Sequence, residues 1–214
     1  ACTAISFYLL HRWGLNAWVH PAFHDVFPLA RELSTALEAL TCFVLIAVLI
    51  NSEHAGSIVK VSRITAPIFM TIGLILYFLG VEFAQAWLLA IGAFFFGVGG
   101  PWLFISTAST LLTLSMSGAL LAVLVGSLIQ CLVSVVAGTA SLSLPVMFAL
   151  QIIICLGCFL YGWKSTASLP KTIASQTSLA TELFLNPRSF IPASHPLFTS
   201  VVLAGIVRGI ALTY

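Results

Sequence analysis

Charged side chains are scarce in this sequence. Only 7% of its 214 residues are Asp, Glu, Lys or Arg, whereas 60% are hydrophobic, and the mean hydropathy is +1.14. A soluble domain usually carries about 25% charged residues. The composition therefore excludes a water-soluble domain and indicates a polytopic membrane protein. The net charge of +2 is also too small to suggest that the chain itself binds nucleic acid.

The sequence also lacks the motifs of enzyme and metal chemistry. It holds no P-loop and no nucleophile–base arrangement, and the GVGGPW stretch at 97–102 lacks the spacing and the preceding strand of a dinucleotide motif. Its five cysteines fall mostly in apolar runs, and the CxxC at 155–158 has no second pair to complete a zinc site. The HPAFHD segment at 20–25 likewise has no second cluster of ligands. We therefore expect no enzyme, no cofactor and no metal.

Long uncharged runs fill most of the chain. The clearest is Pro145–Trp163, which holds no charged residue and is followed by Lys164. A helix of about 20 apolar residues crosses a hydrocarbon core of roughly 30 Å, and aromatic residues followed by lysine are typical of its end at the lipid headgroups. Barrel strands instead alternate over about 10 residues. We therefore interpret the fold as all-α, a polytopic transmembrane helix bundle.

Six spans and the start of a seventh are predicted from these runs. The spans cover 3–19, 29–50, 64–80, 86–105, 118–137 and 145–163, and the seventh helix starts near 197. The polar connections between them are expected at 51–63, 81–85, 106–117 and 138–144. The chain thus divides into a six-helix bundle at 1–163, a cytoplasmic connecting loop at 164–196, and the truncated start of a second bundle at 197–214. We expect the protein to continue beyond both ends of this sequence.

Helix-breaking residues and small residues predict further details of these helices. His20-Pro21 is expected to close the first helix, and Gly99, Gly100 and Pro101 together predict a close-packed kink or a partial break in the fourth. The fifth helix carries small residues four positions apart, which favour close packing of another helix. These residues are Gly118, Ala122 and Gly126.

Positive charges set the expected orientation. Two Lys and Arg residues fall in the 51–63 connection and three in 164–196, whereas the connections on the opposite side hold none, or one if Arg31, near that side in the second helix, is counted. Cytoplasmic loops are enriched in Lys and Arg. We therefore expect a multi-pass protein of the bacterial inner (cytoplasmic) membrane with a cytoplasmic N-terminus and the lipid bilayer as its immediate partner.

A few polar side chains interrupt the apolar runs and are the candidate ligand-binding residues. They are Arg12, Glu38, Gln130, Gln151 and Arg208. A lone Arg or Glu at the bilayer centre costs about 2.5–3.5 kcal/mol, so such residues face the bundle interior. We hypothesise an Arg12–Glu38 pair, which acts either as a lock between the first two helices or as part of a ligand site. The glutamines either line the same polar cavity or form hydrogen bonds between helices.

The end of the chain carries a resemblance to a known family. The segments NPRSFIPASHPLF at 186–198 and GIVRGIALTY at 205–214 resemble the membrane half of a group of LuxR-type transcription regulators. In that group a bundle similar to the major facilitator fold precedes a C-terminal helix-turn-helix domain. The resemblance implies that this chain is the N-terminal half of such a bundle.

The function implied by this resemblance is the sensing of a small ligand in the membrane. DNA would then be reached only through the missing helix-turn-helix domain, and the missing second helix bundle would be a further partner. The alternative is the N-terminal half of a major-facilitator-type secondary transporter. Such transporters typically carry Gly-x-x-x-Asp-Arg-x-Gly-Arg between the second and third helices, whereas this chain reads AGSIVKVSR at 55–63. A third alternative is a structural membrane protein without a ligand.

Overall fold

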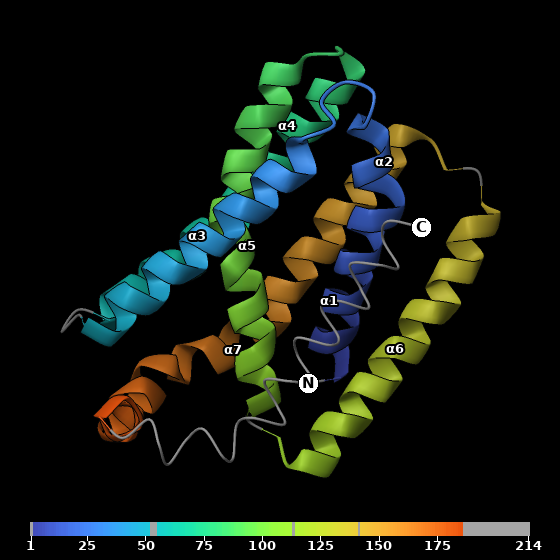
Figure 1. Ribbon diagram of the computed structural model, residues 1–214. Helices are drawn as coiled ribbons and strands as arrows, with labels where there is room; N and C mark the ends of the chain where they lie inside the picture. The colour runs from blue at the N-terminus through green and yellow to red at the C-terminus, as the bar shows by residue number, and fades with distance from the viewer. Residues whose placement is uncertain (1, 52–54, 113, 141, 186–214) are drawn as a thin grey trace. The chain divides into compact units, whose positions relative to one another are not determined.

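The computed structural model describes residues 2–51, 55–112, 114–140 and 142–185 of the chain. These residues form helices joined by short turns and contain no strand, which confirms the all-α class over this part of the chain (Figure 1). The chain divides into two compact units, Ala1–Pro170 and Lys171–Tyr214. The helices described below and the candidate site belong to the first unit, apart from the C-terminal end of the last helix.

The helices follow one another in a simple order. They are α1 (Cys2–Gly14), the π-helical turn η1 (Leu15–Val19), α2 (His20–Phe23), α3 (Ala30–Asn51), α4 (Ala55–Glu82), α5 (Ala86–Leu112), α6 (Met116–Thr139) and α7 (Leu144–Leu185). Four segments are long enough and apolar enough to cross a membrane: Gly56–Glu82, Ala86–Leu111, Ser117–Thr139 and Leu144–Ala167. Each contains one of the spans predicted from the sequence. The first two predicted spans are also helical, in α1 and α3.

Hydrophobic side chains cover the outer face of α6. Large apolar residues on this helix are mostly exposed, among them Leu120, Leu121, Leu124, Leu128 and Leu132. Leu124, for example, is 67% exposed. Such a face suits contact with lipid tails rather than with water, which agrees with a membrane protein.

Several predicted connections are wrong because the helices run further than expected. Residues 55–63, 106–112 and 164–185 are helical, so the 51–63, 106–117 and 164–196 connections are shorter than predicted over the described residues. Residues 186–196, and the seventh helix predicted from 197, lie outside the described residues. The helix also runs through Gly99–Pro101, so the partial break predicted there does not occur.

Hydroxyl side chains explain the error at the end of α5. The Thr107 hydroxyl donates to the Leu103 carbonyl at 3.0 Å, and the Thr110 hydroxyl donates to the Ser106 carbonyl at 2.9 Å. A Ser or Thr in a helix satisfies its own polarity in this way on the preceding turn. A run of Ser and Thr is therefore compatible with a continuing helix and does not mark a loop.

Glycines line the contact between α4 and α5. A Cβ on Gly73 would lie 2.9 Å from the Phe96 backbone nitrogen, and a Cβ on Gly92 would lie 3.1 Å from the Gly73 carbonyl oxygen. Gly80 meets Leu89 in the same interface. The two backbones therefore approach each other at glycines, which allow the closest approach of two helices.

An aromatic core fills the space between these helices. The Phe23 and Tyr77 ring centroids lie 5.1 Å apart, those of Tyr77 and Phe96 lie 5.7 Å apart, and those of Phe96 and His11 lie 6.0 Å apart. All four side chains are buried. The contacts form one continuous row of rings through α2, α4, α5 and α1, at separations typical of favourable aromatic pairs.

Candidate ligand-binding site

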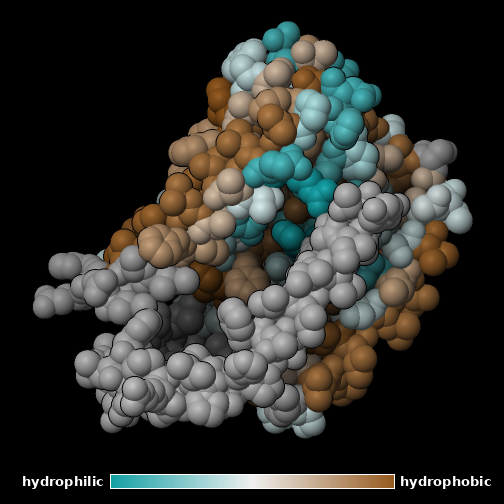
Figure 2. All heavy atoms as spheres, in the orientation of Figure 1, coloured by the Kyte–Doolittle hydropathy of each residue, from teal (hydrophilic) through white to brown (hydrophobic). Residues whose placement is uncertain are grey.

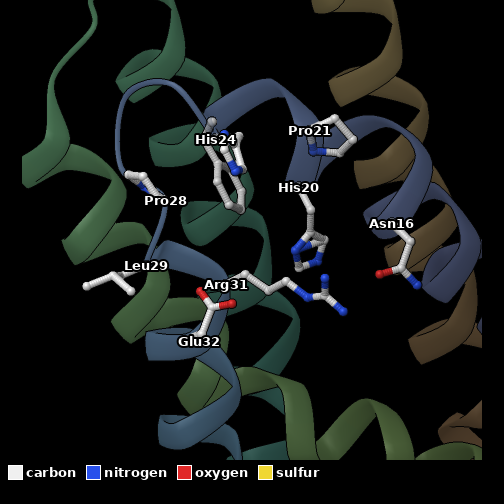
Figure 3. Close-up of a pocket in the computed structure, with 9 residues that line it drawn as sticks. Asn16, His20, Pro21, His24, Pro28, Leu29, Arg31 and Glu32 are labelled. Atoms are coloured by element: carbon white, nitrogen blue, oxygen red, sulfur yellow. The ribbon is translucent and has the colours of Figure 1, made fainter. Parts of the chain in front are cut away.

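A polar pocket lies where the first helix ends and α3 begins (Figure 3). It has a volume of about 720 Å³. Its lining residues are Asn16, His20, Pro21, Phe23, His24, Pro28, Leu29, Arg31 and Glu32. Figure 2 shows hydrophilic residues gathered over the end of the bundle that holds α2 and the start of α3, with hydrophobic residues over much of the visible flanks. A pocket of several hundred Å³ with a few convergent polar groups is the usual form of a small-molecule site.

A π-helical turn shapes one wall of this pocket. The His20 backbone N–H donates to the Leu15 carbonyl, five residues back. Pro21 follows in the first turn of α2, and it has no N–H and a ring that crowds the preceding turn. The wider turn accommodates the proline, so the helix continues to Phe23 and the prediction that His20-Pro21 closes it is wrong. Single π-helical turns occur frequently at functional sites.

Asn16 stabilises the opening of this turn. Its side-chain amide donates to the Arg12 carbonyl at 3.0 Å. That carbonyl lies where the regular hydrogen-bond pattern of α1 gives way to the wider pattern of η1. The side-chain bond satisfies an oxygen that the altered pattern would otherwise expose, and it holds Asn16 at the edge of the pocket.

Two arginines lie in or near the pocket without a direct ion pair to a described carboxylate. Arg31 extends across the pocket beneath His20 in Figure 3, and Arg12 is close enough to both His20 and Glu38 to interact with them electrostatically. Within the described part of the chain, neither guanidinium has a carboxylate oxygen within 4.0 Å, and the ion pair found there joins His24 and Asp25 at 3.6 Å. An anionic group would therefore be attracted to this end of the pocket.

Both arginines affect the protonation of His20. Its Nδ1 atom is buried and has no hydrogen-bond partner among the described residues. Burial, followed by the charges of Arg31 and Arg12, lowers the pKa of His20 to about 4. The imidazole is therefore neutral at pH 7 in the empty pocket.

A pH titration tests this environment. The unfolded chain protonates His20 near pH 6.5 and the folded chain only near pH 4, so the contribution of this residue to stability is complete above pH 6.5 and is lost as the pH falls toward 4. Over this pH range we expect His20 to lower the unfolding free energy of the wild type by about 1–2 kcal/mol, allowing for solvent screening. His20→Gln should not show this decrease. Unfolding free energies of both proteins in detergent at pH 7, 5.5 and 4.5 measure this. Parallel pH profiles would contradict the assignment.

Glu38 lies deeper in the bundle than the pocket. The direct Arg12–Glu38 ion pair that we hypothesised is not formed in the described part of the chain, although the two charges interact at longer range. The Glu38 carboxyl instead packs against α5, where a Cβ on Gly100 would lie 3.1 Å from it. Gly97 packs against Leu37 of α3, and Gly99 packs against Met70 of α4. The glycines of GVGGPW thus make room for α3 on one side and α4 on the other.

Gln151 forms a link between helices. It is fully buried, and its side-chain amide lies 2.8 Å from the His11 Nδ1 atom and donates to the His11 carbonyl at 2.9 Å. His11 is buried against the Phe96 ring. The Gln151 Oε1 atom has no partner among the described residues and lies against Gly14, where a Cβ would clash with it. His11 was not among the candidates selected from the sequence, although a histidine inside an apolar run indicates a buried hydrogen bond.

The other predicted site residues lie apart from the pocket. Gln130 is half-buried on α6, and Arg208 lies outside the described residues. Ala122 is fully buried and Gly126 faces Ile5 of α1, whereas Gly118 faces Ser115, the cap of its own helix. None of the four described candidates, Arg12, Glu38, Gln130 and Gln151, belongs to the lining of the pocket at the α2–α3 end.

A second polar contact ties α4 to α7. The Arg63 guanidinium carbon lies 4.1 Å from the centre of the Trp163 ring, and the guanidinium donates to the Trp163 carbonyl. Lys60 lies one turn earlier on the same helix and is exposed. This contact joins α4 to α7 beside the basic residues of the first half of α4.

Removing Arg63 measures the strength of this contact. We expect Arg63→Leu to lower the unfolding free energy by about 1–2 kcal/mol, since it removes a cation–π contact and a charge-assisted hydrogen bond. The matched change Lys60→Leu removes the same charge one turn away without a comparable contact, and its effect should stay within about 0.5 kcal/mol. Equal losses in a denaturant titration in micelles would show that the Trp163 contact contributes nothing.

No protein-family model matches the chain, and no curated protein or solved structure matches it. Among the described residues, no group of three His, Cys, Asp or Glu side chains is placed to hold a metal ion. The polar pocket is thus the feature from which a function is argued.

Proposed function

We propose that this chain is the small-ligand-sensing membrane region of a LuxR-type transcription regulator whose DNA-binding domain lies in residues beyond it. The observation that carries the proposal is the pocket at the α2–α3 end of the bundle, with Arg31 in its lining, Arg12 near its His20 side chain, and a His20 nitrogen that has no partner among the described residues. Uncompensated charge and orphaned polar atoms are costly in an apolar bundle, so their presence favours a binding function.

A row of contacts connects the pocket to the last helix of the first unit. Phe23 lines the pocket and contacts Tyr77, which contacts Phe96, and Phe96 packs on His11, the partner of Gln151 in α7. A ligand that shifts Phe23 would therefore act on tightly packed side chains as far as α7. A sensor requires that the ligand bind two arrangements of these contacts with different affinity.

One observation favours the alternative, the N-terminal half of a major-facilitator-type transporter. The pocket is open near α2 and α3, while Arg63 and Trp163 join α4 to α7 elsewhere in the bundle. Alternating access requires a site that opens to one side while the other side is closed. The AGSIVKVSR sequence in place of the transporter motif favours the sensor over this alternative.

The coding sequence after Tyr214 tests the proposal directly. We expect further membrane spans followed by a basic helix-turn-helix domain. A protein that ends shortly after further spans would contradict the regulator and support the transporter. Deleting the helix-turn-helix domain, if present, should abolish binding of the protein to DNA while leaving ligand-dependent changes in the bundle intact.

A further inference from the structure

The charges around the pocket define the kind of ligand that it can hold. Arg31 reaches into the pocket, and its guanidinium lies on the Asn16 side in Figure 3, away from Glu32. A guanidinium offers five N–H donors in a planar fork that matches two oxygens of a carboxylate or phosphate. Because no carboxylate of the described chain lies within 4.0 Å of Arg31, this fork is available to a ligand.

His20 supplies a second group at the same place. Its ring hangs above the Arg31 side chain in Figure 3, and its buried Nδ1 atom has no partner among the described residues. A bound anion would offset the charges of Arg31 and Arg12, which oppose protonation of this ring. Protonation puts an N–H donor on both ring nitrogens, and the imidazolium could then donate a hydrogen bond to the anion.

We infer that this pocket recognises an anionic carboxylate or phosphate group on a small ligand, with Arg31 as the main contact and His20 as the second donor. This inference names the ligand class of the proposed sensing site and so rests on the proposed function. Binding should strengthen as the pH falls. The charged and titratable groups around His20 are Arg12 on α1, Arg31 and Glu32 at the start of α3, and His24 at the pocket edge.

Calorimetric titration of the whole chain tests the inference. The chain is placed in phosphatidylcholine nanodiscs and titrated with sodium succinate and with sodium sulfate at constant ionic strength, with choline chloride as the cationic comparison. We expect both oxyanions to bind and choline not to bind. Arg31→Gln should weaken both affinities by about tenfold or more, the loss expected for one charge-assisted contact. Lys60→Gln, which removes the same charge from an exposed site on α4, should leave them unchanged.

The pH arm isolates His20. Sulfate keeps its charge between pH 7 and pH 5, so any gain in its affinity over this range belongs to the protein. We expect a gain in the wild type and none in His20→Gln. If Arg31→Gln does not fold, Arg31→Lys keeps the charge but loses the fork, and it should still weaken binding severalfold. Oxyanion affinities that are equal in wild type and both Arg31 variants, or absent from the wild type, would overturn the inference.

One further experiment distinguishes a lipid anion from a soluble anion. A second comparison distinguishes failure of the anion site from failure of the proposed regulator function. If adding phosphatidylglycerol to the nanodiscs lowers the affinity for both probes, the anionic group is a lipid phosphate; if it has no effect, the ligand is soluble. A helix-turn-helix domain after Tyr214 combined with no oxyanion binding would overturn the ligand class and leave the regulator standing. Oxyanion binding in a protein without that domain would support the anion site and contradict the regulator.

Discussion

Gly73→Leu should destabilise the bundle by about 3 kcal/mol or more, the upper range for forcing extra atoms into a packed interior. Even a single Cβ at this position would lie 2.9 Å from the Phe96 backbone nitrogen and 3.1 Å from the Gly92 carbonyl oxygen. Both neighbours are backbone atoms of α5, which cannot rotate away as a side chain can. The added leucine must therefore push α4 and α5 apart and separate Tyr77 from Phe96.

The matched control for this change is Gly138→Leu. Gly138 lies near the end of α6, and a Cβ added there meets nothing within 4 Å. Leucine has the higher helix propensity, so this change should be neutral or should stabilise the protein by up to about 1 kcal/mol. Unfolding free energies of the two variants in mixed micelles measure the contrast. Equal stability of the two variants would show that the glycine contact between α4 and α5 is not formed.

His11→Ala should cost about 2–4 kcal/mol, the second largest effect that we expect. The change empties a buried site beside Phe96 and removes the side-chain partner of the Gln151 amide, which keeps only the backbone carbonyl of residue 11. Gln151→Ala should cost a similar amount for the same reasons. The double variant should be more stable than the sum of the two losses predicts, by about 0.6–1.7 kcal/mol, which is the range of measured hydrogen bonds between membrane helices.

Gln130→Ala is the control for this cycle. Gln130 is half-buried on α6, so its loss should change stability by about 0.5 kcal/mol or less. The comparison separates a structural link from a general preference for glutamine in the membrane. Strictly additive losses for His11 and Gln151 would mean that the two side chains do not interact.

Hydropathy predicted the helices because a run of about 20 apolar residues has few alternatives in a membrane. Helix ends were predicted less well. Pro21 was predicted to end the first helix, yet the π-helical turn before it lets the helix continue to Phe23. Thr107 and Thr110 were predicted to lie in a polar loop, yet each hydroxyl donates a hydrogen bond to a carbonyl of its own helix. In both cases a local hydrogen bond that composition does not reveal decided the boundary.

The packing and the site were predicted only in part. The sequence analysis found the small residues of α6 but missed the glycine pairs of α4 and α5, Gly73 with Gly80 and Gly92 with Gly99, although each pair is spaced by two helical turns on one face. It also placed the ligand site at residues inside the apolar runs. The described pocket lies at a helix end, and its charged residues Arg31 and Glu32 were not among the ligand-binding candidates selected from the sequence.

The central claim is that an apolar helix bundle spans a membrane and presents the Arg31 pocket outside the cell. Labelling with a membrane-impermeant maleimide in intact cells tests it most directly, in a background without the five native cysteines. Leu29 lines the pocket and is 62% exposed, and Ser57 is exposed near the start of α4. We predict that Leu29→Cys is labelled in intact cells and that Ser57→Cys is labelled only after permeabilisation. The reverse pattern would invert the orientation, and labelling of both positions in intact cells would contradict a bundle that spans the membrane.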